Sequence, residues 1–539
     1  MSILPVQEIR LQEDVDTKLK EQTLGTVQLR HNETNEIILV PTPSNDPNDP
    51  LNWSPTRKYY IFSLTCFGIF FAHAVIVGPA VALELITLEF FGPGPDTVPN
   101  NIAKASYLQT GCSLMIGAGN LIWVPLAIKY GRRPVYIASY LLLTASSASF
   151  GSALVGRLFL GFACAAAEIV APLTITDLFF LHQRGRAMVI YTCSLSAGVG
   201  VGVVFSGLIT QAYSWRMIFW VFSAFVGTCT VLVLFTFPET HYRRRYATEL
   251  EVVPSRHEST KPSSQCLENP PSSSHTSSPS TWKTYLATMR VFSGTYTSEP
   301  LLALMFRPLV AITLPAVFWA TLINAITTGM IVVISANFSN AFSTVYGFHT
   351  WQSGLTYLST IFGSFLAIFC GGHFTDWMAD KLTIRSGGTR IPEMRLPAMI
   401  ISLITGPLSC ILYGAGFAKK LHWICPTIGI GLVNFTTVQS NNVALVYILD
   451  SYRPIAGEVI VTQSFFKAVF GFLLSFYVNV WVQESGYLSV FGTLAGISAA
   501  VFLSTIPFYF FGNRMRQATW KWKFSRQFLH WHPDREVGE

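Results

Sequence analysis

Charged residues are scarce in this chain. Of its 539 residues only 12% are charged and 50% are hydrophobic, whereas soluble chains carry roughly 25% charged residues. The net charge of +7 does not point to nucleic acid, because the basic residues lie in short clusters between apolar runs. The composition therefore predicts a protein of the lipid bilayer.

Sequence motifs for catalysis, nucleotide binding and metal binding are also missing. The nine cysteines form no CxxC pair, which gives no sign of a zinc site or a disulfide framework. No HExxH, GxSxG or Walker-type GKS or GKT sequence occurs either. We therefore expect neither a membrane enzyme nor an ATP-driven pump, and no cofactor is implied.

Long apolar runs are abundant instead. A transmembrane helix needs about 20 mostly apolar residues, and such runs occur in two sets of six. The first set lies at 59–83, 104–128, 134–154, 157–181, 187–211 and 216–237, and the second at 308–334, 351–375, 397–417, 423–449, 455–482 and 487–511. This pattern predicts an all-α membrane protein of twelve transmembrane helices in two six-helix bundles.

Polar segments divide the chain further. We expect tails at 1–58 and 512–539, bundles at 59–237 and 307–511, and a largely disordered central loop at 238–306, where the sequence is rich in Ser and Pro. Lys and Arg are concentrated in the loops that lie on the same side as this central loop. The positive-inside rule then places both termini and the central loop in the cytoplasm.

Two loop motifs stand at equivalent positions in the two halves. KYGRRPVY follows the second run, and GGHFTDWMADK follows the eighth. Both resemble the signature loop of the major facilitator superfamily, in which a glycine and an acid four residues later latch the cytoplasmic side. The second copy keeps Gly372 and Asp376, whereas the first has Val124 and Ile128 at those positions. The resemblance therefore predicts an N-terminal latch without its usual glycine and acid.

Other stretches narrow the resemblance. The chain contains, in this order, NDPLNWS, RLFLGF, DLFFLHQRGRAM, SWRMIFW and RIPEMRLP. Together these stretches resemble the fungal drug:proton antiporters with twelve spans. The resemblance covers about residues 46 to 511 and implies alternating access to a central site, a small organic substrate and protons as the coupling ion. One departure is that Val203 follows Gly202, where the antiporters have proline. Because of this departure, proton-coupled import of organic cations or other small nutrients remains the alternative hypothesis to export.

This resemblance also sets expectations about the cellular setting. The partners are a small-molecule substrate, protons and the lipid bilayer, with no nucleic acid. We expect a monomer in the plasma membrane, with the vacuolar membrane as the alternative.

Ionisable residues within the predicted spans mark candidate proton sites, because a charge deep in a bilayer costs at least a few kcal/mol. Arg157 and Glu168 are eleven residues apart in one span, hence on one helical face about 16 Å apart, which puts Glu168 near the midplane. We expect Glu168 to carry the proton, with Arg157 and His73 as further candidates. Lys467 is also near a span centre and could attract an anionic group or pair with Glu168. Structural roles remain open for all four.

Polar residues elsewhere in the spans suggest a substrate cavity and a cytoplasmic gate. Amides suit hydrogen bonding to a substrate in an apolar pocket, although they also join helices. The cavity candidates are Lys467, Asn324, Thr328, Asn434, Gln439, Asn441 and Asn442. The gate candidates, at cytoplasmic helix ends, are Gly131, Arg132, Arg133, Asp177, Arg184, Arg186, Gly372, Asp376, Asp450, Arg453 and Glu458.

Overall fold

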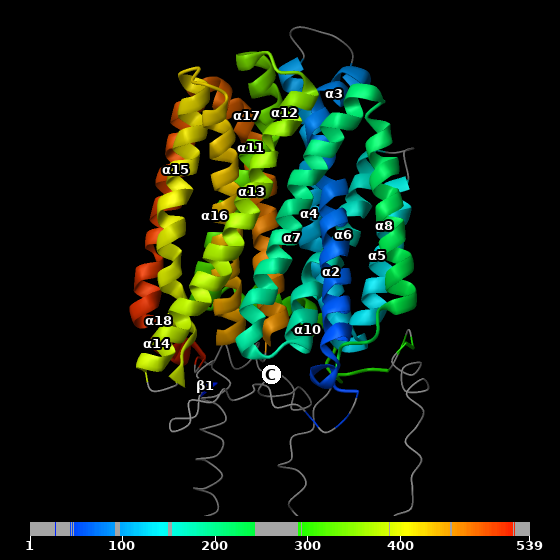
Figure 1. Ribbon diagram of the computed structural model, residues 1–539, viewed down its shortest axis with the longest axis vertical. Helices are drawn as coiled ribbons and strands as arrows, with labels where there is room; N and C mark the ends of the chain where they lie inside the picture. Colours follow the sequence, from blue (N-terminus) through cyan, green and yellow to red (C-terminus); the bar gives the residue numbers. More distant parts are fainter. Residues whose placement is uncertain are drawn as a thin grey trace, which may run out of the picture.

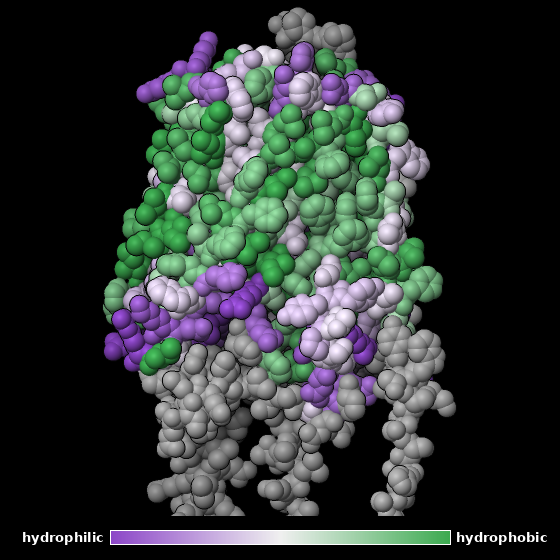
Figure 2. All heavy atoms as spheres, in the orientation of Figure 1, coloured by the Kyte–Doolittle hydropathy of each residue, from purple (hydrophilic) through white to green (hydrophobic). Residues whose placement is uncertain are grey.

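The computed structural model shows an almost entirely helical protein whose long helices run side by side (Figure 1). Apolar side chains cover its middle, and hydrophilic ones gather at its two ends (Figure 2). A bilayer requires this arrangement, because helices satisfy their own backbone groups and apolar side chains can face lipid. The described residues are 27–28, 44, 46, 48–91, 98–148, 153–242, 289–290, 292, 294–386, 389–452, 455–520 and 522.

The N-terminal half contributes seven α-helices and two short 3₁₀-helices among the described residues. They are η1 (Pro50–Asn52), α2 (Pro55–Val77), η2 (Gly78–Ala82), α3 (Leu83–Phe91), α4 (Val98–Tyr130), α5 (Arg132–Ala148), α6 (Ala153–Leu178), α7 (Leu181–Ala212) and α8 (Arg216–Thr236). The start of α2 is fixed by Ser54, whose side chain accepts a hydrogen bond from the backbone N–H of Arg57, and by Pro55 at the first helical position.

The C-terminal half is built in the same way. Its helices are α10 (Leu301–Ala311), α11 (Pro315–Tyr346), α12 (Thr350–Thr356), α13 (Leu358–Ala367), the π-helix η4 (Ile368–Phe374), α14 (Thr375–Arg385), the 3₁₀-helix η5 (Pro392–Ala398), α15 (Met399–Ala418), α16 (Ile424–Ser451), α17 (Ala456–Leu503) and α18 (Thr505–Trp520). A two-residue strand β1 (Val27–Gln28) pairs antiparallel with β2 (Thr389–Arg390). Helix α17 contains parts of two spans, which meet at Gly486, where φ is 76°.

Ten segments of the described chain are long and apolar enough to span a bilayer. The other two predicted spans correspond to α5, which has 17 described residues, and α16, which has 28 residues and several polar side chains. Together they complete two bundles of six, so the predicted all-α fold of twelve transmembrane helices is confirmed. The predicted tails and central loop fall largely outside the described residues, and Arg453 lies outside them too.

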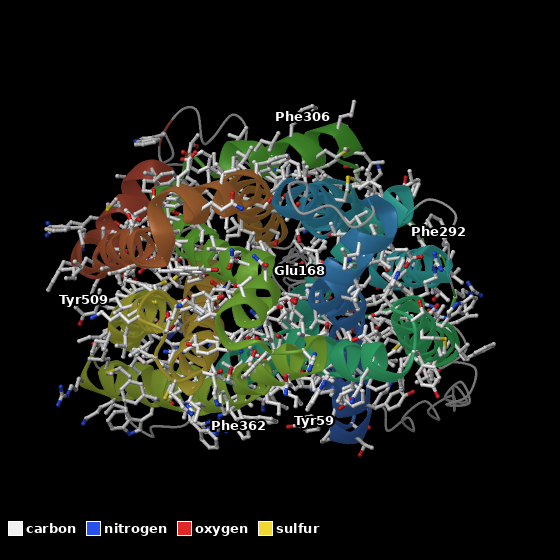
Figure 3. All side chains as sticks on the ribbon, turned by 90° about the horizontal axis from the view of Figure 1, so that it is seen from above. Tyr59, Glu168, Phe292, Phe306, Phe362 and Tyr509 are labelled. Atoms are coloured by element: carbon white, nitrogen blue, oxygen red, sulfur yellow. The ribbon has the colours of Figure 1, made fainter. Side chains whose placement is uncertain are left out.

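Small residues let the two bundles approach each other closely. At the end of the molecule opposite to α14 (Figure 1), α7 meets α12, where a Cβ atom added to Gly207 would lie 3.4 Å from the Cα atom of Gly354. Nearer the middle, Gly117 of α4 packs against Ala468 of α17. Seen along the long axis, Glu168 lies at the centre, between the bundles (Figure 3). Close packing of small residues therefore surrounds the region where the candidate site lies.

Candidate functional site

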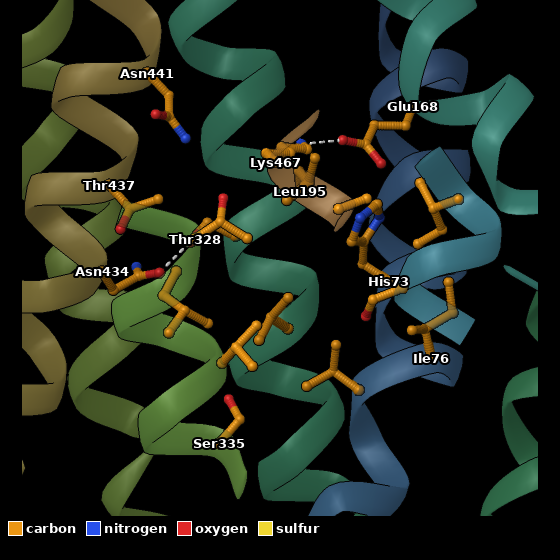
Figure 4. Close-up of a pocket in the computed structure, with 18 of the residues that line it drawn as sticks. His73, Ile76, Glu168, Leu195, Thr328, Ser335, Asn434, Thr437, Asn441 and Lys467 are labelled. Carbon is orange, nitrogen blue, oxygen red and sulfur yellow. Dashed lines mark hydrogen bonds and ion pairs between the residues drawn. The ribbon is translucent and has the colours of Figure 1, made fainter. Parts of the chain in front are cut away.

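A cavity of about 260 Å³ lies between the two bundles. Its lining comes from α2, η2, α3, α4, α6 and α7 on one side and from α11, α13, α16 and α17 on the other, and it is mostly apolar. Seven sequence-predicted residues line it, several of them drawn in Figure 4: His73, Glu168, Asn324, Thr328, Asn434, Asn441 and Lys467. The structure therefore brings together side chains that are up to 394 residues apart in the chain, the separation of His73 and Lys467 (467 − 73).

The central feature of this cavity is an ion pair between the bundles. Nζ of Lys467, on α17, lies 2.5 Å from Oε1 of Glu168, on α6 (Figure 4). The side chains are 20% and 7% exposed, respectively. Lys467 thus reaches the cavity while it neutralises the acid. Of the alternatives that the sequence left open for Lys467, the structure shows the pairing with Glu168.

His73 lies beside this pair. Its Nδ1 atom is 3.2 Å from the carbonyl oxygen of Ile69, one turn earlier in α2, and a carbonyl oxygen only accepts. Nδ1 therefore carries the hydrogen, which leaves Nε2 as the nitrogen available for proton exchange. On the other side of Glu168, the hydroxyl of Tyr191 donates to the backbone carbonyl of Glu168. Tyr191 thus joins α7 to α6 at Glu168, while His73 faces the pair from α2 (Figure 4).

Arg157 has a different position and does not line the cavity. Its guanidinium donates to the carbonyl oxygens of Val75 (3.1 Å) and Ile76 (2.9 Å) and to the side-chain oxygen of Gln109 (2.6 Å). Pro79 has no N–H that could bond to the carbonyl of Val75. Arg157 therefore stabilises the break between α2 and η2, whose residues line the cavity.

Two amides of α16 connect helices at the cavity wall. The side-chain oxygen of Asn434 accepts a hydrogen bond from the hydroxyl of Ser196, on α7, and its nitrogen donates to Ser364 on α13. Oδ1 of Asn441 accepts from the hydroxyl of Thr327, on α11, at 3.1 Å. Asn434 therefore joins the two bundles, as Glu168 and Lys467 do, while Asn441 joins helices within one bundle.

Gln439 and Asn442 do not line the cavity, contrary to the sequence-based expectation. The Asn442 amide donates to the carbonyl of Gly371 at 2.8 Å, and the Gln439 amide faces the carbonyl of Ala398 at 3.5 Å. Each residue of an α-helix turns by about 100°, so these two side chains leave the face that Asn434 and Asn441 share. They pack against η4 and η5 instead.

Several polar residues of the lining were not predicted from the sequence. They include Gln109 and Ser113 on α4, Tyr191 and Ser196 on α7, Ser335 on α11, and Gln463 and Ser464 on α17. Gln463 precedes Lys467 by one helical turn, and this spacing could have identified it. The hydroxyl residues carry no comparable signal, because Ser and Thr are tolerated at lipid-facing and packed positions alike.

At the end of the bundles that is predicted to face the cytoplasm, the gate candidates of the N-terminal half join helices of their own bundle. Nε of Arg132 lies 3.1 Å from Oδ2 of Asp177. Glu239, which was not predicted, accepts hydrogen bonds from the backbone N–H groups of Arg132 and Arg133 at 2.9 and 3.1 Å. At Gly131 φ is 100°, and an added Cβ would collide with Glu239. This loop therefore connects α5, α6 and the end of α8.

The C-terminal copy of the motif lies where the two bundles meet. Asp376 is 3.2 Å from Arg395, and Arg395 is 3.6 Å from Asp450. A Cβ added to Gly185, in α7 of the other bundle, would lie 2.5 Å from Oδ1 of Asp376, and one added to Gly372 would meet the side chain of Val189 at 3.5 Å. The charges of this loop thus face the N-terminal bundle directly.

The remaining gate candidates lie in different surroundings. Arg184 donates to the carbonyl oxygens of Phe179 and Thr176 and lines, with Asp450, a small cavity between the bundles. Arg186 is exposed. Glu458 is buried and lies 3.9 Å from Arg307 of α10.

Two six-helix bundles around a central cavity, with polar groups from both, define a secondary membrane transporter that is not an enzyme. The sequence agrees, because residues 64–460 match the Major Facilitator Superfamily. The chain belongs to that superfamily.

Distant fungal relatives match most of the chain. Protein HOL1 of Saccharomyces cerevisiae is 24% identical over 94% of this chain and 93% of its own length. MFS transporter cpaT of Aspergillus oryzae is 25% identical over 87% and 90%, and multidrug transporter TPO1_2 of Candida glabrata is 25% identical over 86% and 76%. These relatives are too distant to name a substrate for this chain.

Solved structures share the fold. The proton:xylose symporter XylE superposes with a TM-score of 0.59 at 12% identity and covers 87% of this chain and all of its own. The human organic anion transporter MFSD10 superposes with a TM-score of 0.58 at 13% identity and covers 84% of this chain and all of its own. At such identities the likeness concerns the fold alone.

Proposed function

We propose that this transporter is a proton-coupled efflux pump for a small organic compound, such as a drug, a toxicant or a fungal secondary metabolite. The observation that carries the proposal is the Glu168–Lys467 ion pair, which joins the two bundles at the cavity. The similarity to a protein named a multidrug transporter supports the substrate class. We further propose the plasma membrane as its location, with the arginine-rich ends of the helices in the cytoplasm.

The ion pair offers a simple coupling step. A proton that reaches Glu168 removes the negative charge and with it the attraction between α6 and α17. Lys467 is 20% exposed and faces the cavity, so its ammonium group stays solvated when the partner becomes neutral. The bundles can then separate, and release of the proton on the other side restores the pair.

Other groups close to Glu168 belong to the same proposal. His73 on α2, Cys164 on α6 and Tyr191 on α7 are further titratable groups near Glu168. His73 is the second candidate for a proton relay, because it lines the cavity beside the pair. Arg157 is held by the carbonyl oxygens of α2, and we propose that it positions the cavity wall.

Import of an organic cation is less compatible with this site. A cation importer needs an acid that can bind the cation, but Lys467 already occupies the carboxylate of Glu168. A cation would have to displace an ammonium group for which the described residues of the lining offer no second acid. This argument concerns the charge of the substrate and not the direction of transport. We propose export because of the similarity to the multidrug transporter, and the flux measurement tests the direction.

The test is transport by the purified protein in liposomes with an imposed pH gradient, for labelled organic cations, anions and neutral compounds. We expect flux to follow the gradient in the wild type and to be lost in Glu168→Gln, which keeps the shape but not the charge. Glu89→Gln is the matched control, because Glu89 forms an exposed ion pair with Arg216 at the outer end. Gradient-independent flux, or normal transport by Glu168→Gln, would show that the proposal is wrong.

A further inference from the structure

One transmembrane segment of the C-terminal bundle changes its winding along its length. Between α13 and α14 the chain forms the π-helix η4, whose backbone hydrogen bonds span one residue more than those of an α-helix. Such segments are rare and are frequently found at functional sites. Because a π-turn takes up one residue more than an α-turn, it sets the direction of every later side chain in the helix. The first charged side chain after η4 is Asp376, which lies 3.2 Å from Arg395.

The backbone of η4 accepts hydrogen bonds from two side chains. Nδ2 of Asn442, on α16, donates to the carbonyl oxygen of Gly371 at 2.8 Å. The hydroxyl of Thr375 donates to the carbonyl oxygen of Cys370 at 3.2 Å. Where a helix changes its winding, backbone groups lose their regular partners, and buried ones need substitutes. Two consecutive carbonyl groups of η4 thus receive a side-chain donor, and one donor comes from a different helix.

The two glycines of η4 allow close contacts on two sides. A Cβ atom added to Gly371 would lie 2.6 Å from Oε1 of Gln439, on α16. One added to Gly372 would meet the side chain of Val189, on α7 of the N-terminal bundle, at 3.5 Å. Asn442 follows Gln439 by three residues, so both amides lie on the face of α16 that meets η4. A change in the winding of η4 therefore alters contacts within its own bundle and contacts with the other bundle.

The winding of η4 also decides where α14 directs Asp376. An α-helix turns by about 100° per residue, so conversion of η4 to an α-helix would turn α14 by about that angle relative to α13. Asp376 would then leave Arg395. It would also leave Gly185 of α7, where an added Cβ would lie 2.5 Å from Oδ1 of Asp376. The π form thus keeps this carboxylate at the contact between the bundles.

We infer that Asn442 is a positioning residue for this contact: by donating to Gly371 it holds η4 in the π form, which directs Asp376 at Arg395 and α7. Loss of the hydrogen bond lets η4 rewind as an α-helix, turns α14 and releases the N-terminal bundle from Asp376. Asn442 acts on the contact through the backbone of another helix. The inference goes beyond the proposed function, because it depends neither on a particular substrate nor on protons.

The test is Asn442→Leu in the full-length protein in lipid nanodiscs, because leucine keeps the size of the side chain and removes the donor. Spin labels attached through a non-natural amino acid are placed at Lys381 on α14 and Ala518 on α18, two exposed positions near the same end of the molecule (Figure 1). A turn of about 100° moves a label on a helix of about 10–12 Å diameter by about 8 Å. We expect a second distance, shifted by up to this amount, with a population about fivefold above that of the wild type, as loss of one typical hydrogen bond predicts.

Thr436→Val is the matched control. It also removes one buried hydrogen bond of α16, but this bond joins Thr405 on α15 at 2.8 Å and not η4. The control should leave the distance between the α14 and α18 labels unchanged. An unchanged distance in Asn442→Leu, or an equal change in both variants, would overturn the inference.

Two further variants separate the winding of η4 from the charge of Asp376. Deletion of Phe369, an outward-facing residue of η4 that is 64% exposed, removes the extra residue, so η4 can wind as an α-helix while α14 keeps its direction. We expect the wild-type distance between the α14 and α18 labels in this deletion, even when it is combined with Asn442→Leu. Asp376→Asn should also keep that distance, but it should lengthen the distance from the α18 label to one at Gln183 on α7. A shift between the α14 and α18 labels in either of these variants would contradict the inference.

Discussion

The two copies of the signature loop differ in where they direct their charges. In the N-terminal half, Arg132 and Arg133 turn into their own bundle, toward Asp177 and Glu239. In the C-terminal half, Asp376 lies against α7 of the other bundle. Although the loops occupy equivalent positions, one connects helices within a bundle and the other borders the interface between bundles.

The difference extends to the neighbouring helix contacts. At the N-terminal loop, α4 meets α17 through Ile128, whose Cδ1 atom would lie 3.1 Å from a Cβ added to Gly457. This contact is apolar and the side chain can move. At the C-terminal loop, Gly185 approaches a carboxylate that is itself paired with Arg395. We infer that the N-terminal loop mainly stabilises the fold, whereas the C-terminal loop mainly sets the balance between open and closed cytoplasmic states.

The largest expected effect follows from breaking the N-terminal loop. In Asp177→Asn the buried guanidinium of Arg132 keeps its charge and loses its acid, and removing one partner of a buried pair costs about 3–5 kcal/mol. We expect a loss of that size in the free energy of unfolding, measured by SDS titration. Asp376→Asn is the comparison in the other loop: its partner Arg395 keeps a second acid, Asp450, at 3.6 Å, so we expect a smaller loss there. Equal losses in the two variants would contradict the comparison.

A smaller effect is expected from glycine substitutions at the two contacts between bundles. Gly185→Ala places a methyl group against Asp376, and such overpacking typically costs about 1–3 kcal/mol. The cost can be avoided if the bundles separate, so we expect a shift toward a cytoplasm-open state. Spin labels at the exposed positions Gln183 and Lys381 would report a longer distance.

The matched variant at the other contact is Gly457→Ala. There the added methyl group meets the end of the Ile128 side chain, which can turn away. We expect little change in the distance between the labels. A larger change in Gly457→Ala than in Gly185→Ala would reverse the roles of the two loops.

The sequence predicted the helices well because apolar runs of span length leave few alternatives, and even the break in α17 at Gly486 falls between two predicted spans. The sequence also predicted that Glu168 and Lys467 lie at the same depth in the membrane, because each is near the centre of a predicted span. It could not assign Gln439 to a face of α16, because polar and apolar residues alternate there without a clear stripe. Glu239 was missed because its contact with Arg132 joins residues 107 positions apart.

The smallest expected effect comes from restoring the family's acid to the N-terminal loop. Ile128→Asp places a carboxylate one turn before Arg132, near the C-terminal end of α4, where the helix dipole disfavours a negative charge by about 0.3–1 kcal/mol. It also removes the apolar contact with Gly457. If this loop only stabilises its bundle, the free energy of unfolding should fall by about 1 kcal/mol while the distance between labels at Gln183 and Lys381 stays the same. If the loop can still act as a latch, the new acid should instead hold the cytoplasmic side closed and shorten that distance. The two halves would then differ because of a single side chain and not because of their architecture.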